Sequence, residues 1–127
     1  MKRVFKTRHF KRWMRKTELT DGALCAAVLE MVEGLIDAEL GGGVVKKRIG
    51  ISGRGKRGGT RTLVATNKGN RWFFVYGFEK NDRANISSDE LEALQALARE
   101  LLALSGKELT QAADDSTLEE ICHEASN

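Results

Sequence analysis

Apolar residues recur every three to four positions in three stretches of the chain, which is the period of an amphipathic helix. These stretches are residues 8–16, 21–35 and 86–104. In the first, the apolar side chains share one face, and lysines and arginines take the other. Thr20 is a helix-capping residue type placed before the second, and Ser87 with Glu90 matches a capping box at the start of the third. The pattern therefore predicts three helices.

Apolar residues alternate with polar ones, or run together, in four stretches that are typical of strands. They are residues 3–6, 44–51, 60–66 and 71–78. The last, RWFFVYGF, is apolar enough for a central strand that is buried on both faces. NKGN at 67–70 suits a hairpin loop, and the three glycines at 41–43 end the helical region. Residues 44–78 therefore predict a three-stranded antiparallel meander.

The end of the chain repeats the capping-box pattern twice. Ser105 with Glu108, and Thr117 with Glu120, have the required spacing, so we expect two short helical segments in an acidic tail. The full order is an N-terminal strand, two helices, the meander, a helix and the tail. Helices that are segregated from an antiparallel sheet indicate an α+β fold, which is the class we predict.

Length and composition favour a single folded domain. A chain of 127 residues that is 41% hydrophobic and 31% charged is ordinary for one soluble globular domain. No apolar run has membrane-spanning length, and no apolar stretch follows the basic N-terminus, so we expect neither a membrane span nor a secretory signal. Cys25 and Cys122 are isolated and far apart, and we interpret them as reduced cytosolic thiols rather than a disulfide or metal ligands. We expect no metal and no cofactor.

Charge is segregated along the sequence, although the net charge is only +3. Residues 1–16 hold eight basic groups and no acid, and residues 46–83 hold eleven basic groups against two acids. Residues 17–45 hold six acids and no base, and residues 84–127 hold ten acids against two bases. Such blocks indicate a polarised surface whose basic parts attract polyanions. The alternative is that opposite blocks neutralise one another in the fold.

The stretch GRGKRGGTR, residues 53–61, concentrates four glycines and four basic side chains in nine positions. It imitates two phosphate loops, but a strand rather than a helix follows it, and Arg57 stands where the P-loop needs Ser or Thr. We expect a basic connection that approaches a polyanion such as nucleic acid, the alternative being a solvated hairpin loop. Arg61 is in phase with Leu63 on the next strand, where a rigidly held guanidinium suits stabilisation of a charged transition state.

The segment KKRIGISGRGKRGGTRTLVATNKGNRWFFVYGFEKND, residues 46–82, resembles the core of the RelE/HigB/ParE superfamily of toxins, in particular its HigB/RelE branch. The GKRGGxR stretch, the hydrophobic strand pair and the KND that follows are specific to that branch. The resemblance covers about residues 3–103 of what we expect to be one RelE-like domain, 1–127, and leaves an acidic extension at about 104–127. The order of strands and helices matches the fold that those toxins share.

The resemblance implies the toxin of a type II toxin–antitoxin system. Such toxins are ribosome-dependent mRNA endoribonucleases, in which the ribose 2′-OH attacks the adjacent phosphate and leaves a 2′,3′-cyclic end. The implied partners are a cognate antitoxin of helix-turn-helix type, the ribosome and mRNA, with operator DNA reached only through the antitoxin complex. The implied location is the cytoplasm, with no membrane contact and no cofactor.

The resemblance also implies roles for single residues. Arg61 matches the arginine that contacts the scissile phosphate, and Lys47, Arg48 and Lys80 match other basic catalytic positions. The residues implied to contact RNA or the ribosome are Lys46, Arg54, Lys56, Arg57 and Arg83. The chain departs from the family at Ile86, where base-stacking members have an aromatic residue.

Two alternatives stay open. His9 and His123 could form an acid–base pair, but one lies in a basic helix and the other in an acidic tail, so a surface role for each is favoured. The second alternative is a non-catalytic RelE/ParE-like module that binds nucleic acid or an antitoxin, or a toxin that acts on another target.

Overall fold

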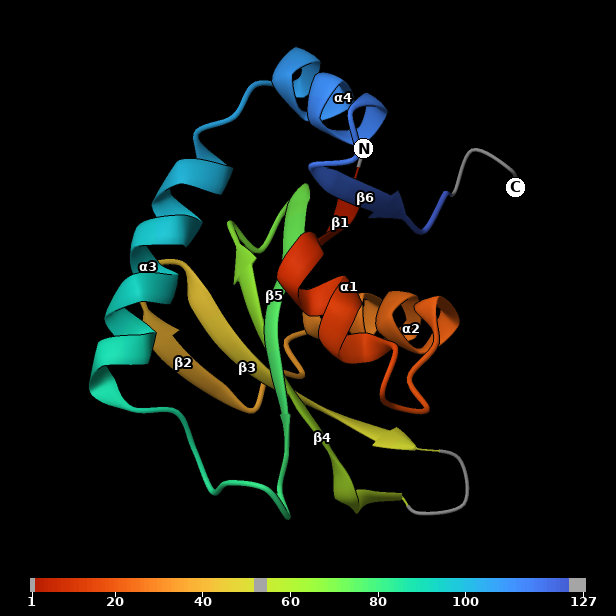
Figure 1. Cartoon of the computed structure of the whole chain (residues 1–127), viewed down its shortest axis with the longest axis vertical. Helices are drawn as coiled ribbons and strands as arrows, with labels where there is room; N and C mark the ends of the chain where they lie inside the picture. The colour runs from red at the N-terminus through yellow and green to blue at the C-terminus, as the bar shows by residue number, and fades with distance from the viewer. Residues whose placement is uncertain (1, 52–54, 124–127) are drawn as a thin grey trace.

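The computed structural model describes residues 2–51 and 55–123, with only the backbone of residues 51 and 55–58, and Arg54 lies outside this range. Strands and helices follow one another along the described chain as Figure 1 shows. In order they are β1 (Arg3–Thr7), α1 (Arg8–Met14), α2 (Asp21–Val32), β2 (Ala38–Gly41), β3 (Val44–Ile51), β4 (Gly55–Thr66), β5 (Arg71–Glu79), α3 (Ser88–Leu102), α4 (Gly106–Asp114) and β6 (Leu118–Ile121). None of the described helices is long and apolar enough to cross a membrane.

The described strands form one mixed sheet in the order β2-β3-β4-β5-β1-β6. β3 pairs antiparallel with β4, and β4 pairs antiparallel with β5, so the predicted meander is confirmed. β1 lies parallel to β5, with Val4 opposite Trp72, and β6 returns antiparallel along the other edge of β1. The α+β class is therefore confirmed, with a sheet that is mixed rather than purely antiparallel.

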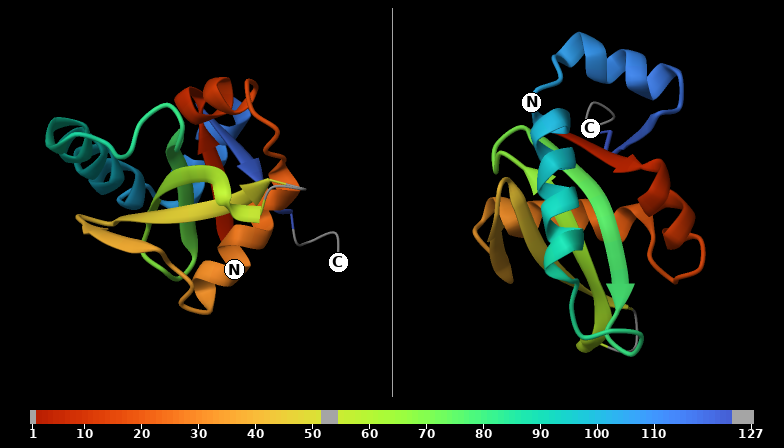
Figure 2. Two further views of the ribbon diagram at one scale, coloured as in Figure 1. Left: turned by 90° about the horizontal axis from the view of Figure 1, so that it is seen from below. Right: turned by 60° about the vertical axis from the view of Figure 1, so that its left-hand side comes forward.

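Helices cover both faces of this sheet (Figure 2). α1 and α2 pack on one face and α3 on the other, and each face has its own hydrophobic cluster. Along β5, Trp72 and Phe74 enter the cluster beneath α1 and α2, whereas Phe73 and Val75 enter the cluster beneath α3. All four side chains are at most 2% exposed. The interpretation of RWFFVYGF as a central strand that is buried on both faces is confirmed.

The helix starts follow the predicted capping signals. The capping boxes at Ser87 and Ser105 are both formed, and Thr20 caps α2. α2 ends at Val32 rather than near residue 35, because Gly34 takes a φ of 93° and turns the chain out of the helix.

The strand β2 was not predicted. Gly41, Gly42 and Gly43 take φ angles of 83°, 62° and 82°, which glycine adopts without steric cost, and they turn the chain from β2 into β3. The glycines therefore connect a hairpin rather than end a helical region. Because β2 has four residues, its alternation is too short to predict a strand from the sequence.

The second helical segment expected in the tail is wrong, because residues Leu118–Ile121 form the strand β6. Thr117 bonds Asp115 through both its backbone N–H and its hydroxyl, and the chain then pairs with β1. Leu118 and Ile121 are each 4% exposed and belong to the clusters on opposite faces of the sheet. Residues 118–121 form a strand because the open edge of β1 is there to pair with them. A local capping pattern contains no information about that long-range pairing.

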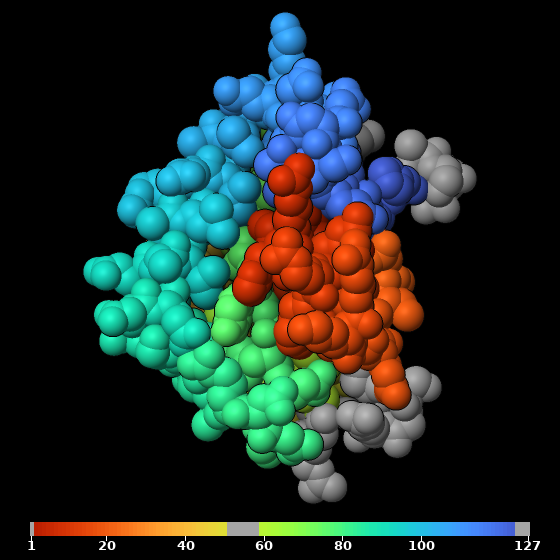
Figure 3. Space-filling model, in the orientation of Figure 1, coloured from red at the N-terminus to blue at the C-terminus, as the bar shows by residue number. Residues whose placement is uncertain are grey.

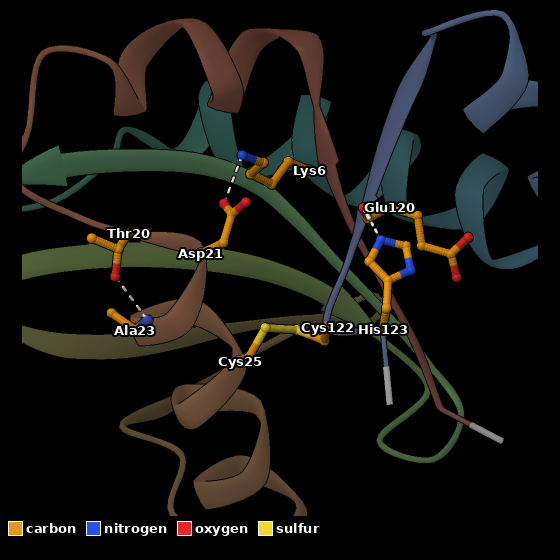
Figure 4. The surroundings of a disulfide bond; sticks show 8 residues. All are labelled: Lys6, Thr20, Asp21, Ala23, Cys25, Glu120, Cys122 and His123. Atoms are coloured by element: carbon orange, nitrogen blue, oxygen red, sulfur yellow. Dashed lines mark hydrogen bonds and ion pairs between the residues drawn. A yellow bond between two sulfur atoms is a disulfide. The ribbon is translucent and has the colours of Figure 1, made fainter. Parts of the chain in front are cut away.

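The interpretation of the cysteines as separate thiols is also wrong. Cys25 on α2 and Cys122 after β6 form a disulfide, with their Cα atoms 5.6 Å apart across a sequence separation of 97 (Figure 4). The two residues meet because β6 pairs with β1 at the edge of the sheet that α2 covers. The proximity therefore depends on a long-range strand pairing that cysteine spacing does not reveal.

Candidate functional site between α1 and α3

Two arginines lie side by side on the face of the sheet that α3 covers. Arg48 on β3 and Arg61 on β4 are direct partners in the antiparallel ladder. Arg61 is in phase with Leu63, which belongs to the cluster beneath α3, so both side chains project on that face. Arg61 Nη1 donates to the carbonyl of Gly59 at 3.1 Å, and among the described residues its guanidinium forms no ion pair. Two arginines at directly paired positions of rigid strands concentrate positive charge that attracts an anion.

Lys46 projects on the same face and is half-buried opposite Leu63. Lys47 projects on the other face, because successive side chains of a strand alternate. Its ammonium is 2.7 Å from Glu30 Oε1 and donates to the carbonyl of Leu35 at 2.8 Å, and the residue is only 2% exposed. The structure therefore separates Lys47 from the two arginines and ties it to α2 and the turn that follows.

A row of rings leads away from Arg61 along β5. Phe78 is the ladder partner of Arg61, and the ring of Tyr76 is 6.4 Å from that of Phe78. The imidazole of His9, at the start of α1, stacks on Tyr76 with ring centroids 5.5 Å apart and planes inclined by 7°. His9 is exposed and Tyr76 is partly exposed, so this end of the row offers ring surface to a ligand.

Arg83 and Glu90 form an ion pair beside the rings of Tyr76 and Phe78. Arg83 binds the Glu90 carboxylate through two nitrogens, at 2.6 and 2.8 Å, and Arg83 Nη1 also lies 3.2 Å from the Tyr76 hydroxyl. The hydrogen bond from Arg83 is the main cause that lowers the pKa of Glu90 to about 2. The same pair raises the pKa of Arg83. Arg83 is therefore held in place over the ring of Phe78, 6.0 Å from its centroid.

The remaining basic candidates lie around the same end of the sheet. Lys80 is exposed directly after β5, on the turn that leads to Arg83. Lys56 and Arg57 belong to the first residues of β4, where only the backbone is described. Arg54 lies outside the described residues. The structure thus brings together Lys46, Arg48 and Arg61 on one face, with Arg83 beside Phe78.

The row of rings ends in an apolar groove between α1 and α3. The cavity has a volume of about 520 Å³ and is lined along α3 by Leu94, Leu97 and Leu101. Tyr76 and His9 line its other side. Figure 3 looks onto this groove, with red residues of α1 on one side, cyan residues of α3 on the other and green residues of β5 between them. Sequence reasoning missed this arrangement, because α1 docks onto β5 from a distant part of the chain.

The family model described as the RelE toxin of the RelE / RelB toxin-antitoxin system matches residues 2–121. The chain belongs to the RelE toxin family. The match includes α4 and β6 as well as the sheet. No curated protein matches the chain significantly. Family membership makes this chain the toxin of a toxin–antitoxin system, and its partner is an antitoxin.

Proposed function

We propose that this RelE-family toxin belongs to the HigB branch and inhibits translation in the cytoplasm by cleaving mRNA on the ribosome. Toxins of this family are usually endoribonucleases. In this proposal a helix-turn-helix antitoxin neutralises the toxin and carries any contact with operator DNA.

The single observation that supports cleavage is the cross-strand pair of Arg48 and Arg61, next to Phe78 at the start of the row of rings. A phosphate bound at this arginine pair gains negative charge as the ribose 2′-OH attacks it, and fixed positive charge stabilises that transition state. The P–O5′ bond breaks as the new P–O2′ bond forms, the 2′-OH gives up its proton to solvent and the leaving 5′ oxygen takes one up, which leaves a 2′,3′-cyclic phosphate and a 5′-hydroxyl. No metal or cofactor enters this scheme.

Other residues bind and orient the RNA in this proposal. A base next to the scissile phosphate stacks on Tyr76 and His9, because stacking on aromatic rings holds single-stranded RNA without a sequence requirement. Lys46 and Lys80, with Arg54, Lys56 and Arg57 of the glycine-rich stretch, bind flanking phosphates. Arg83 positions Tyr76 rather than binding phosphate, since Glu90 already pairs with its guanidinium. Lys47 stabilises the fold through Glu30.

The test is induced expression of the wild type and Arg61→Ala in a bacterial host, with growth followed and message 5′ ends mapped. Arg99→Ala is the matched control, because Arg99 is also an arginine and is exposed on α3. We expect growth arrest and new cuts inside translated messages for the wild type and the control, and neither for Arg61→Ala. Arrest without cuts would point to another target. Cuts that persist in Arg61→Ala would remove the arginine pair from the mechanism.

Purified components separate catalysis from simple binding. The toxin is incubated with a message either free or bound to ribosomes, and the ends of the products are analysed. Cleavage only on the ribosome, with a 2′,3′-cyclic phosphate, is expected. Binding to the ribosome without any cleavage would favour the non-catalytic alternative.

A further inference from the structure

A second basic surface lies outside the groove, on α1. Arg8, Lys11, Arg12 and Arg15 stand at spacings of three and four residues, so they share one face of the helix, opposite buried Phe10 and Met14. These four residues, together with Lys6 of β1, line one wall of a cleft of about 610 Å³. We name it the α1 cleft.

The opposite wall of the α1 cleft comes from the acidic tail. Asp114 of α4 and Glu119 and Glu120 of β6 line it. Figure 3 shows the red N-terminal residues meeting the blue C-terminal residues on the face of the molecule that it presents. The tail thus forms a concave site with the basic helix, whereas charges that only keep a helix soluble need no facing wall.

Carboxylates neutralise only part of this basic surface. Lys6 is 6% exposed, with its ammonium 2.7 Å from Asp21 Oδ1 and 3.7 Å from Glu119 Oε1 (Figure 4 shows the first contact). Glu119 Oε1 also lies 3.0 Å from Lys11 Nζ. Arg12 and Arg15 are exposed and form no ion pair within the described part of the chain. Arg12 and Arg15 therefore remain available to an anion, whereas the neighbouring Lys11 is paired with Glu119.

We propose that the α1 cleft binds the phosphate backbone of RNA, and that Glu119 competes with the RNA for Lys11. The row from Arg8 to Arg15 extends over about 10 Å along the helix, since each helical residue rises 1.5 Å. A row of that length fits consecutive phosphates better than one small anion. The proposed function supplies only the identity of the polyanion as RNA, and binding at the α1 cleft does not require cleavage.

The source of the RNA can be the message or the ribosome, because both present the same phosphates. Binding is measured by fluorescence anisotropy with a single-stranded 20-mer in which every ribose is 2′-O-methylated, and by co-sedimentation with empty 70S ribosomes. The methylated RNA cannot react by 2′-OH attack, so its binding is independent of the proposed cleavage. A toxin that binds it but never cleaves a message would refute the proposed function alone.

The test variants are Arg12→Ala with Arg15→Ala, Glu119→Gln, and Arg99→Ala as the matched control. Each lost phosphate contact costs about 5-fold in affinity near 0.1 M salt, because binding a single strand releases about 0.7 counterion per contact. The double variant is therefore expected to bind about 25-fold more weakly. The slope of log binding constant against log salt concentration is expected to be smaller in magnitude by about 1.4. Glu119→Gln is expected to bind about 5-fold more tightly, since it frees Lys11 for a further phosphate.

Circular dichroism and thermal melting must show that each variant is folded, and Arg12 and Arg15 are exposed enough for the double variant to remain so. Weaker binding to the 20-mer and to ribosomes supports contact with single-stranded RNA in general. Weaker binding to ribosomes alone assigns the α1 cleft to ribosomal RNA. Unchanged binding of the double variant to both, or an equal loss in Arg99→Ala, would overturn the proposal.

Discussion

Reduction of the Cys25–Cys122 disulfide is expected to destabilise the toxin strongly. The bond joins α2 to the chain directly after β6, which has four residues and is the outermost strand on its side of the sheet. Closing a loop of this length, across a sequence separation of 97, removes entropy from the unfolded chain. The chain-entropy relation gives about 16 cal/mol/K, or about 4.7 kcal/mol at 25 °C, and measured effects of native disulfides are about 2–5 kcal/mol.

This loss converts into a change of melting temperature. An unfolding entropy of about 2.1 cal/mol/K per residue amounts to about 270 cal/mol/K for a chain of this length. A loss of 2–4.7 kcal/mol therefore lowers Tm by about 7–17 °C. Thermal melts followed by circular dichroism, with and without a phosphine reductant, measure the difference, and thiol alkylation with mass spectrometry reports the state of the cysteines.

The matched control is the variant with both Cys25→Ala and Cys122→Ala. Its Tm is expected to be close to that of the reduced wild type and to stay the same when reductant is added. A Tm that falls equally in this variant on addition of reductant would show that the effect does not come from the disulfide. An oxidised and a fully reduced wild type that melt at the same temperature would refute the loop-closure argument. Reducing conditions, under which such bonds are rare, therefore favour the less stable reduced form.

Three further outcomes are expected. Gly77→Ala places a Cβ 2.2 Å from the ring of Trp13, which packs across this glycine, so it should cost about 1–3 kcal/mol of unfolding free energy in denaturant titrations. Lys47→Met should lower stability by about 1–3 kcal/mol because it removes the contacts of the buried Lys47 ammonium with the partly exposed Glu30 and the Leu35 carbonyl, yet leave message cleavage intact, and loss of cleavage in a folded variant would contradict its structural role. The pKa of Glu90 is lowered to about 2 by Arg83, so this pair should stabilise the fold at neutral pH and down to the unfolded value near 4.5. That contribution should then be lost as the pH falls toward 2, and NMR titration of the carboxyl carbon checks the pKa.

The elements that sequence reasoning placed correctly are those whose signals are local. The capping boxes at Ser87 and Ser105 and the apolar run of β5 each specify their structure within a few residues. β6 has no such signal, because its buried Leu118 and Ile121 are three residues apart, a spacing that suits a helix as well as a short strand. Pairing with the open edge of β1 decides between them, and the disulfide of Cys122 depends on that pairing.

The candidate site shows the same division between local and long-range information. The phase of Arg61 follows from Leu63 on its own strand. β3, however, buries Val44 on one face and Val45 on the other, so its pattern does not decide whether Lys47 or Arg48 shares a face with Arg61. The ladder register decides in favour of Arg48.

Both interpretations of the segregated charges apply to this fold. Some opposite charges neutralise one another, and other basic groups remain available to a polyanion. β6 brings Glu119 and Glu120 to the basic N-terminal segment, where they pair with Lys6, Lys11 and Arg3. Arg12 and Arg15 are exposed and form no ion pair within the described part of the chain, whereas Arg8 donates to the carbonyl of Ser116. A phosphate must displace a carboxylate to reach Lys11, whereas it need only release counterions to reach the arginines. Because the carboxylate opposes binding at one contact and not at its neighbours, the acidic tail sets how strongly the basic helix binds RNA rather than cancelling its charge.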